Sequence, residues 1–141
     1  MLTDGYQKVK NLFARYESAR NFTVRQEAAE RVFAELEIHT QLEETIFYPA
    51  YEAHAGTQGT QLVAESRVVH KRVKELMQAL QGLDVEDEAF EITFSALMDD
   101  VQHHVAEEEN KMFPEAQKIL GDQLEALMDD MLALKTRVTT T

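Results

Sequence analysis

One short pattern occurs twice in the chain, and this repeat constrains the fold and the chemistry more than any other feature. The first copy runs from His39 to Pro49 as HTQLEETIFYP, and the second runs from His104 to Pro114 as HVAEEENKMFP. On a helix, residues i and i+4 lie one turn apart on the same face, so each copy directs an imidazole and a carboxylate to one point. Each copy therefore predicts half of a metal site, and two copies predict a pair of ions joined by carboxylates.

Both His-x-x-x-Glu pairs fall on the apolar stripe of a helix, where an unpaired charge is costly. A single pair of this kind is common on solvated helix faces, but its repetition on two apolar stripes favours inward-facing ligands. The stripe around the first pair is Val32, Leu36, His39, Glu43, Ile46 and Ala50. The stripe around the second pair is Phe90, Phe94, Leu97, Val101, His104 and Glu108.

Composition limits what the site can be. The chain has 141 residues, which predicts a single domain over residues 1–141. It has no cysteine, so any metal takes nitrogen and oxygen ligands rather than thiolates. The formal net charge of -12 disfavours nucleic acid and anionic membranes as partners. We find neither a membrane-spanning apolar run nor a basic-then-apolar leader, which predicts a cytoplasmic location.

Helical periodicity with few helix breakers predicts an all-α fold: an up-down-up-down four-helix bundle with an additional C-terminal helix. We expect the bundle over residues 2–120 and the extra helix over residues 122–138. Thr23 is the predicted N-cap of the second bundle helix, as part of a capping box. Pro49 and Pro114 lie late in the second and fourth helices, where each predicts a kink or a loosened turn.

The repeat extends beyond the two patterned segments. Tyr6 in the first helix aligns with His70 in the third, and both residues lie on the apolar face of their helix. Two helical hairpins related by a pseudo-twofold axis bring all four apolar stripes to one central point. Tyr6 and His70 are therefore expected to face the same place as the two His-x-x-x-Glu pairs.

This pattern resembles the hemerythrin-like proteins, the HHE cation-binding family. That family has a His on the first helix, His-x-x-x-Glu on the second, a His on the third and His-x-x-x-Glu on the fourth, and the resemblance covers residues 2–120. It implies a non-haem site with two iron ions, oxo- or hydroxo-bridged, in which Glu43 and Glu108 bridge the ions. The resemblance implies these metal-site positions: Tyr6, His39, Glu43, His70, His104 and Glu108. Iron rests on the resemblance, because histidine and carboxylate ligands also suit manganese and zinc.

The chain departs from the family pattern at Tyr6, where the first-helix His is expected. Two interpretations compete. Tyr6 is either a phenolate ligand, because an anionic oxygen suits ferric iron, or a residue whose hydroxyl bonds to a carboxylate or a bound water and leaves a coordination position open. Glu44 and Glu109, each next to a bridging candidate, are interpreted as solvated or as suppliers of an extra oxygen ligand.

Three functions are compatible with this site. The first is a binding or sensing protein for dioxygen, nitric oxide or peroxide, in redox response or iron handling. The second is a di-iron enzyme with catalase-like or oxidase activity. The third is a metal-free helical partner module that docks through its last helix. A phenolate at position 6 stabilises ferric iron and argues against reversible dioxygen carriage, which begins from ferrous iron. A monomer and a homodimer are both compatible with the sequence.

Overall fold

The computed structural model describes the backbone of residues 2–140 and the side chains of residues 5–138. The described chain is helical, without a strand, and confirms the predicted all-α class. Within it, no helix is both long and apolar enough to cross a membrane. The elements are α1 (Leu2–Ser18), α2 (Phe22–Leu42), η1 (Glu43–Phe47), α3 (Tyr48–His54), α4 (Thr57–Gln81), α5 (Glu88–Glu107), η2 (Glu108–Met112), α6 (Phe113–Leu120) and α7 (Gln123–Thr140).

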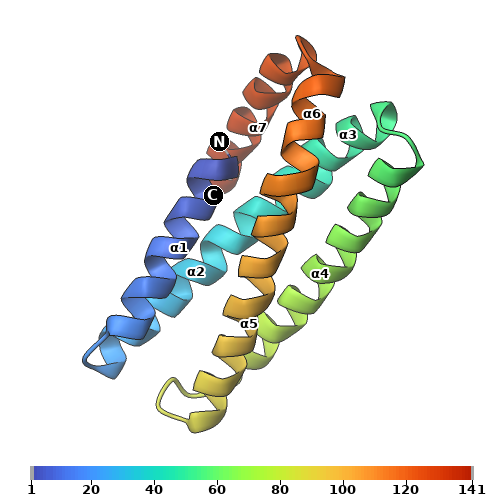
Figure 1. The fold of residues 1–141 in the computed structure, drawn as a ribbon. Coiled ribbons are helices and arrows are strands. Elements are labelled where there is room, and N and C mark those ends of the chain that lie inside the picture. The colour runs from blue at the N-terminus through green and yellow to red at the C-terminus, as the bar shows by residue number, and fades with distance from the viewer. Residues whose placement is uncertain (1, 141) are drawn as a thin grey trace.

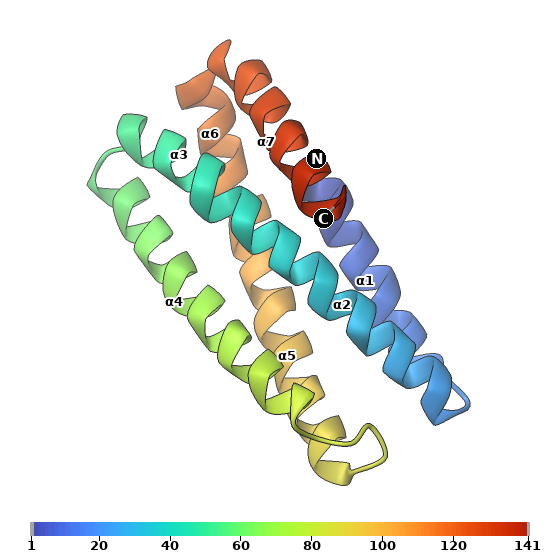
Figure 2. The same cartoon turned by 180° about the vertical axis from the view of Figure 1, so that it is seen from behind.

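The elements form four rods and a covering helix, α7 (Figure 1). One rod is α1, and another is the continuous run of α2, η1 and α3. The remaining two are α4 and the run of α5, η2 and α6, which lie side by side as a hairpin. Helix α7 packs against α2, η1 and α6 and brings the C-terminus back beside the N-terminus (Figure 2). This arrangement confirms the predicted bundle with an additional C-terminal helix.

The bundle interior is apolar at both ends. At one end, the rings of Phe13 and Tyr16 pack on Phe94, with centroids 6.0 and 4.0 Å from it. At the other end, Tyr51, Met112 and Met131 belong to a second cluster that α7 helps to close. Burial of these side chains is the main source of stability for a helical domain.

The second rod begins two residues earlier than the sequence indicated. Asn21, rather than Thr23, is the N-cap, and its side-chain oxygen accepts a hydrogen bond from the Val24 amide at 2.9 Å. Asparagine is at least as good an N-cap as threonine, because its side-chain oxygen also satisfies a free amide of the first turn. The predicted capping box therefore gives way to a simple asparagine cap.

Both patterned segments contain a widened turn, η1 and η2, that starts at the first glutamate of the pair. The amide of Tyr48 donates to the Glu43 carbonyl, and the amide of Phe113 donates to the Glu108 carbonyl, each five residues back. Proline follows directly in both copies, and it has no N–H and crowds the carbonyl four residues before it. The π turn is the loosened turn that the two prolines predicted.

The π turn shifts the buried stripe of the second rod. The sequence placed Ile46 and Ala50 on this stripe, but both are only partly buried. Phe47, Tyr48 and Tyr51 are buried instead, with exposed fractions of 3%, 0% and 0%. One extra residue in the turn rotates everything after Glu43 about the helix axis, so extending a regular 3.6-residue period past Glu43 was wrong.

Phe94 provides a test of the aromatic core. Its side chain is fully buried and contacts the rings of Phe13, Tyr16, Phe33 and Phe90. Phe94→Ala is expected to lower the free energy of unfolding by about 3 to 5 kcal/mol, because it removes a large apolar side chain and leaves a cavity. Urea unfolding followed by circular dichroism measures this change.

The matched control is Ile92→Ala, two residues away on the same helix. Ile92 is 64% exposed, so its truncation is expected to change the free energy of unfolding by less than about 0.5 kcal/mol. Equal losses in the two variants would contradict the assignment of Phe94 to the core.

Candidate metal centre

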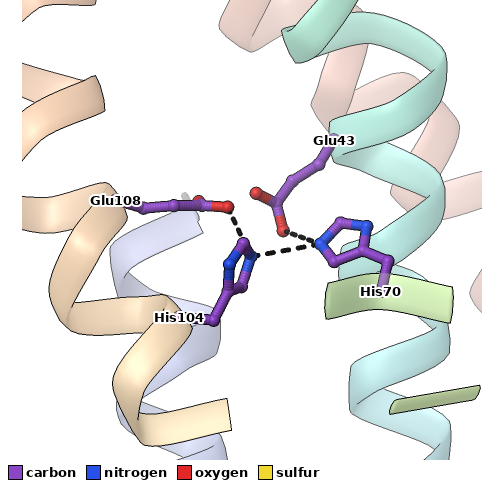
Figure 3. Close-up of side chains that lie close together, drawn as sticks. All are labelled: Glu43, His70, His104 and Glu108. Carbon is purple, nitrogen blue, oxygen red and sulfur yellow. Dashed lines mark hydrogen bonds and ion pairs between the residues drawn. The ribbon is translucent and has the colours of Figure 1, made fainter. Parts of the chain in front are cut away.

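Four side chains from three rods converge in the middle of the bundle (Figure 3). Glu43 and Glu108 come from the first residues of η1 and η2, His104 from the last turn of α5, and His70 from α4. One ligand atom from each lies within 4.8 Å of the others. All four are buried, with exposed fractions of 1% for each glutamate, 6% for His104 and 8% for His70. The cluster is therefore enclosed by protein.

The imidazoles and carboxylates of this cluster contact one another directly. His104 Nε2 lies 2.6 Å from Glu108 Oε1, and His70 Nε2 lies 3.6 Å from Glu43 Oε1. The two Nε2 atoms of His70 and His104 are 3.2 Å apart. The contact between His104 and Glu108 follows from their i,i+4 spacing in a regular helix, as the repeat predicted.

The two oxygens of Glu108 face two different sets of side chains. Oε1 contacts His104, whereas Oε2 accepts a hydrogen bond of 2.6 Å from the Tyr6 hydroxyl. We call His70 and His104 the His70 side of the centre, and Tyr6 and His39 the Tyr6 side. Because its oxygens point to both sides, Glu108 has the position that a bridging carboxylate requires.

Tyr48 belongs to the centre but was missed by sequence reasoning. Its hydroxyl lies within hydrogen-bond distance of both carboxyl groups, 2.5 Å from Glu108 Oε1 and 2.8 Å from Glu43 Oε2, and 3.3 Å from His70 Nε2. In a regular α-helix, residues five apart point about 140° away from each other. The π turn closes residue i onto residue i+5 and so turns Tyr48 toward Glu43. The signal available in the sequence was the proline after Tyr48, which marks the widened turn.

His39 lies beside the four-residue cluster rather than in it. Its ring stacks on Tyr6 with centroids 4.9 Å apart, and its Nε2 packs so closely on Gly5 that a Cβ there would lie 1.8 Å from it. His39 Nδ1 is buried without a hydrogen-bond partner among the described residues. Burial lowers the pKa of His39 to about 4, against the opposing effect of the Glu108 charge, so the ring is neutral at physiological pH.

The two buried carboxyl groups share one proton. Burial and the charge of Glu108 raise the pKa of Glu43 well above its usual range. Burial also acts to raise the pKa of Glu108, but hydrogen bonds from Glu43 and His104 outweigh it and lower this pKa to about 2. Burial lowers the pKa of His104, yet the hydrogen bond to Glu108 and its charge outweigh burial and raise it. Without a cation, Glu43 is therefore the protonated member of the pair.

The same surroundings keep both phenols protonated. Burial raises the pKa of Tyr6 and of Tyr48, and the charges of Glu43 and Glu108 raise both further. A cation between the carboxylates reverses the effect of their charges, because it becomes the dominant local charge. A bound metal would therefore favour loss of the Glu43 proton and would lower the pKa of both phenols.

The remaining candidates from the sequence lie outside the cluster. Glu44 Oε1 is 3.0 Å from His70 Nδ1, the ring nitrogen that faces away from the centre. The side chain of Glu109 makes no hydrogen bond or ion pair within the described part of the chain. Neither glutamate supplies an oxygen to the four-residue group.

Comparisons with known proteins show the family and the fold. The hemerythrin HHE cation binding domain profile matches residues 4–116, so the chain belongs to this family, as the repeat indicated. An uncharacterised hemerythrin-like protein of Schizosaccharomyces pombe is 25% identical over 118 residues, which are 84% of this chain and 58% of that protein's length. The crystal structure of a hemerythrin HHE cation binding domain-containing protein from Mycobacterium kansasii has a TM-score of 0.83 and 24% identity. That match covers 97% of this chain and 83% of the other, and it supports the same fold.

The carboxyl pair makes the metal-free protein sensitive to pH through Glu43. Its raised pKa means that the folded state binds a proton that the unfolded chain releases above about pH 4.5, so stability falls as pH rises from there. Glu43→Gln keeps the shape and removes this proton uptake. We expect chelator-treated Glu43→Gln to be more stable than the chelator-treated wild type, by a margin that grows by up to about 1.4 kcal/mol per pH unit.

Urea unfolding of both metal-free proteins between about pH 5 and about pH 8 measures the margin. The difference between the two proteins removes contributions common to both, including that of His39. A margin that stays constant or shrinks with rising pH would show that Glu43 is not the protonated partner. With metal restored, the order should reverse, because Gln is a poorer ligand than a carboxylate.

Proposed function

We propose that the protein holds two non-haem iron ions and uses them to bind or react with a small oxidant or gas such as dioxygen, hydrogen peroxide or nitric oxide. The observation that carries this proposal is the convergence of buried ligand atoms from Glu43, His70, His104 and Glu108 within 4.8 Å. The corresponding cellular role is redox response or iron handling.

The donor set fits this proposal. Imidazole nitrogens and carboxylate oxygens suit iron, and the chain has no cysteine to favour a softer metal. Two carboxyl groups buried side by side also conflict electrostatically unless one stays protonated or a cation lies between them. A divalent or trivalent cation removes this conflict. We infer iron from the family, because the ligands alone also suit manganese and zinc.

Two ions fit better than one because the ligands lie on two sides of the carboxylates. His70 and His104 supply one side, and Tyr6 and His39 supply the other. His39 is neutral at physiological pH and has a buried ring nitrogen without a partner, as a histidine ligand requires before binding. Glu108 contacts both sides through its two oxygens.

The burial of the centre favours a small reactant. Glu43 and Glu108 are 1% exposed, so an organic substrate has little access to the ions without displacing a helix. Bound iron supplies one-electron redox chemistry and dioxygen chemistry. The surrounding apolar side chains exclude water and limit what reaches the site.

A second candidate function is catalase-like or oxidase activity, and the proton network favours it. Cleaving an O–O bond to water requires protons next to the oxygen that leaves. The Tyr48 hydroxyl lies inside the bundle beside both carboxylates, 2.8 Å from Glu43 Oε2 and 2.5 Å from Glu108 Oε1. Tyr48 can deliver a proton, and the carboxylate of Glu43 can help to return it, without opening the site to solvent.

His104 tests metal binding and turnover together. His104→Ala removes a ligand and leaves Glu108 without its imidazole partner, so we expect iron content per chain to fall from close to two to one or fewer. Elemental analysis of protein purified without added metal measures this content. Peroxide consumption, where the wild type shows it, should fall with the iron.

The matched control is His103→Ala, at the neighbouring exposed position. It should retain wild-type iron content and melting temperature. Peroxide decay that depends on His104 and iron favours the enzyme, whereas tight reversible gas binding without turnover favours the binding protein. A wild type that takes up no metal after reconstitution with ferrous iron would leave the metal-free partner module as the better account.

Two phenylalanine variants test whether a tyrosine ligates the iron. We expect the ferric protein to show a visible phenolate-to-iron charge-transfer band that is lost in Tyr6→Phe and kept in Tyr48→Phe. The reason is that Tyr6 takes the place of the first-helix histidine and reaches the centre from α1. Visible absorption spectra of the iron-loaded variants measure the band.

Two other spectral results would assign different roles to Tyr6 and Tyr48. An unchanged spectrum in Tyr6→Phe would leave Tyr6 as a hydrogen-bond donor to Glu108 only. Loss of the band in Tyr48→Phe alone would assign the phenolate to Tyr48.

A further inference from the structure

The two copies of the repeat carry a second glutamate at the same place, but only one of the two contacts the centre. Glu44 follows Glu43, and Glu109 follows Glu108. Glu44 Oε1 lies 3.0 Å from His70 Nδ1, whereas the side chain of Glu109 makes no hydrogen bond or ion pair among the described residues. The difference requires a cause, because the local sequence and the π turn are alike in both copies.

The cause is the residue on the opposite rod. Helix α4 presents His70 to the first copy, and an imidazole has a second nitrogen on its outer edge. Helix α1 presents Tyr6 at the matching place, and the single hydroxyl of Tyr6 is already bonded to Glu108. Tyrosine has no second polar atom for Glu109 to contact.

The contact with Glu44 fixes which nitrogen of His70 is free. A carboxylate can only accept a hydrogen bond, so Nδ1 of His70 donates to Glu44. The Nε2 atom is then left with its lone pair, 3.2 Å from His104 Nε2 and 3.6 Å from Glu43 Oε1. This is the ring orientation and tautomer that a metal ligand needs.

We propose that Glu44 is a positioning residue that holds His70 ready for metal and thereby makes the ion on the His70 side the more tightly bound of the two. The inference rests on the proposed two-ion function and assigns different properties to its two halves. On the Tyr6 side, no carboxylate among the described residues holds a ligand in this way, because the contact that supports His39 there is with the neutral backbone of Gly5. The ion on the His70 side therefore binds first and leaves last.

The test uses the full chain freed of metal and reloaded with ferrous iron under anaerobic conditions. Competition with a chelator gives the dissociation constants of the two ions for the wild type and for Glu44→Ala, Glu44→Gln and Glu109→Ala. Glu44 has a side chain 36% exposed, so all variants are expected to fold, and the unfolding of each metal-free protein checks this.

We expect Glu44→Ala to raise the dissociation constant of the tighter ion about 10- to 100-fold and to leave the weaker ion unchanged. Glu44→Gln should recover most of the affinity, because its amide oxygen still accepts from His70 Nδ1. It should also raise the reduction midpoint potential of the iron, because it removes a negative charge that stabilises the ferric state. Glu109→Ala should match the wild type in both measurements.

The outcomes separate this inference from the function on which it rests. Wild-type affinity in Glu44→Ala, or equal losses in Glu44→Ala and Glu109→Ala, would overturn the positioning role while leaving the two-ion centre intact. A merely structural effect of Glu44 would lower the stability of the metal-free protein and would leave the midpoint potential of Glu44→Gln unchanged. A wild type that binds no iron would overturn both.

Discussion

Two carboxyl groups in the interior of a small helical bundle are the constraint on which the rest of the structure depends. Glu43 and Glu108 are each 1% exposed, and a desolvated carboxylate without partners is too costly for a domain of this size. Every polar side chain that reaches them reduces this cost: His104 and Tyr6 bond to Glu108, and Tyr48 bonds to both. One proton remains on Glu43 because these contacts are not sufficient to keep both groups ionised. Burial of this kind is destabilising by itself, which is why it indicates a function.

The fold followed from the sequence because its signals were local and repeated. Long apolar stripes fixed the helices, and glycine-containing segments such as Ala55-Gly56 and Gly82 marked their ends. The repeat indicated that two hairpins share one centre, and it therefore predicted that His70 and Tyr6 lie opposite the two His-x-x-x-Glu pairs. His104 and Glu108 meet in the structure for the same reason, since i,i+4 geometry places them on one face of a regular helix.

The sequence did not predict the π turns or the side-chain positions that follow from them. A periodic pattern assumes that every turn has the same number of residues, and the turn that starts at Glu43 has one more. Proline predicted a loosened turn but not the number of residues in it. The sequence therefore placed Ile46 and Ala50 on the buried stripe and did not place Tyr48 there. The position of His39 was also beyond a periodic argument. Its ring stacks on Tyr6 because α1 presents Gly5 one residue earlier, and only a glycine leaves room for an imidazole there.

The two copies of the repeat differ, but each side of the centre still has one phenol that contacts Glu108. On the His70 side, the aromatic residue before proline is Tyr48, and on the Tyr6 side it is Phe113. Each side therefore contributes one phenol, from α3 in one case and from α1 in the other, and each phenol bonds to a different oxygen of Glu108. With Glu44 behind His70 and a phenol in place of a histidine at Tyr6, each side also has one anionic group to offset a trivalent ion. On the proposed function, the absence of a first-helix histidine is thus balanced by the rest of the site, which favours the ferric state on both sides.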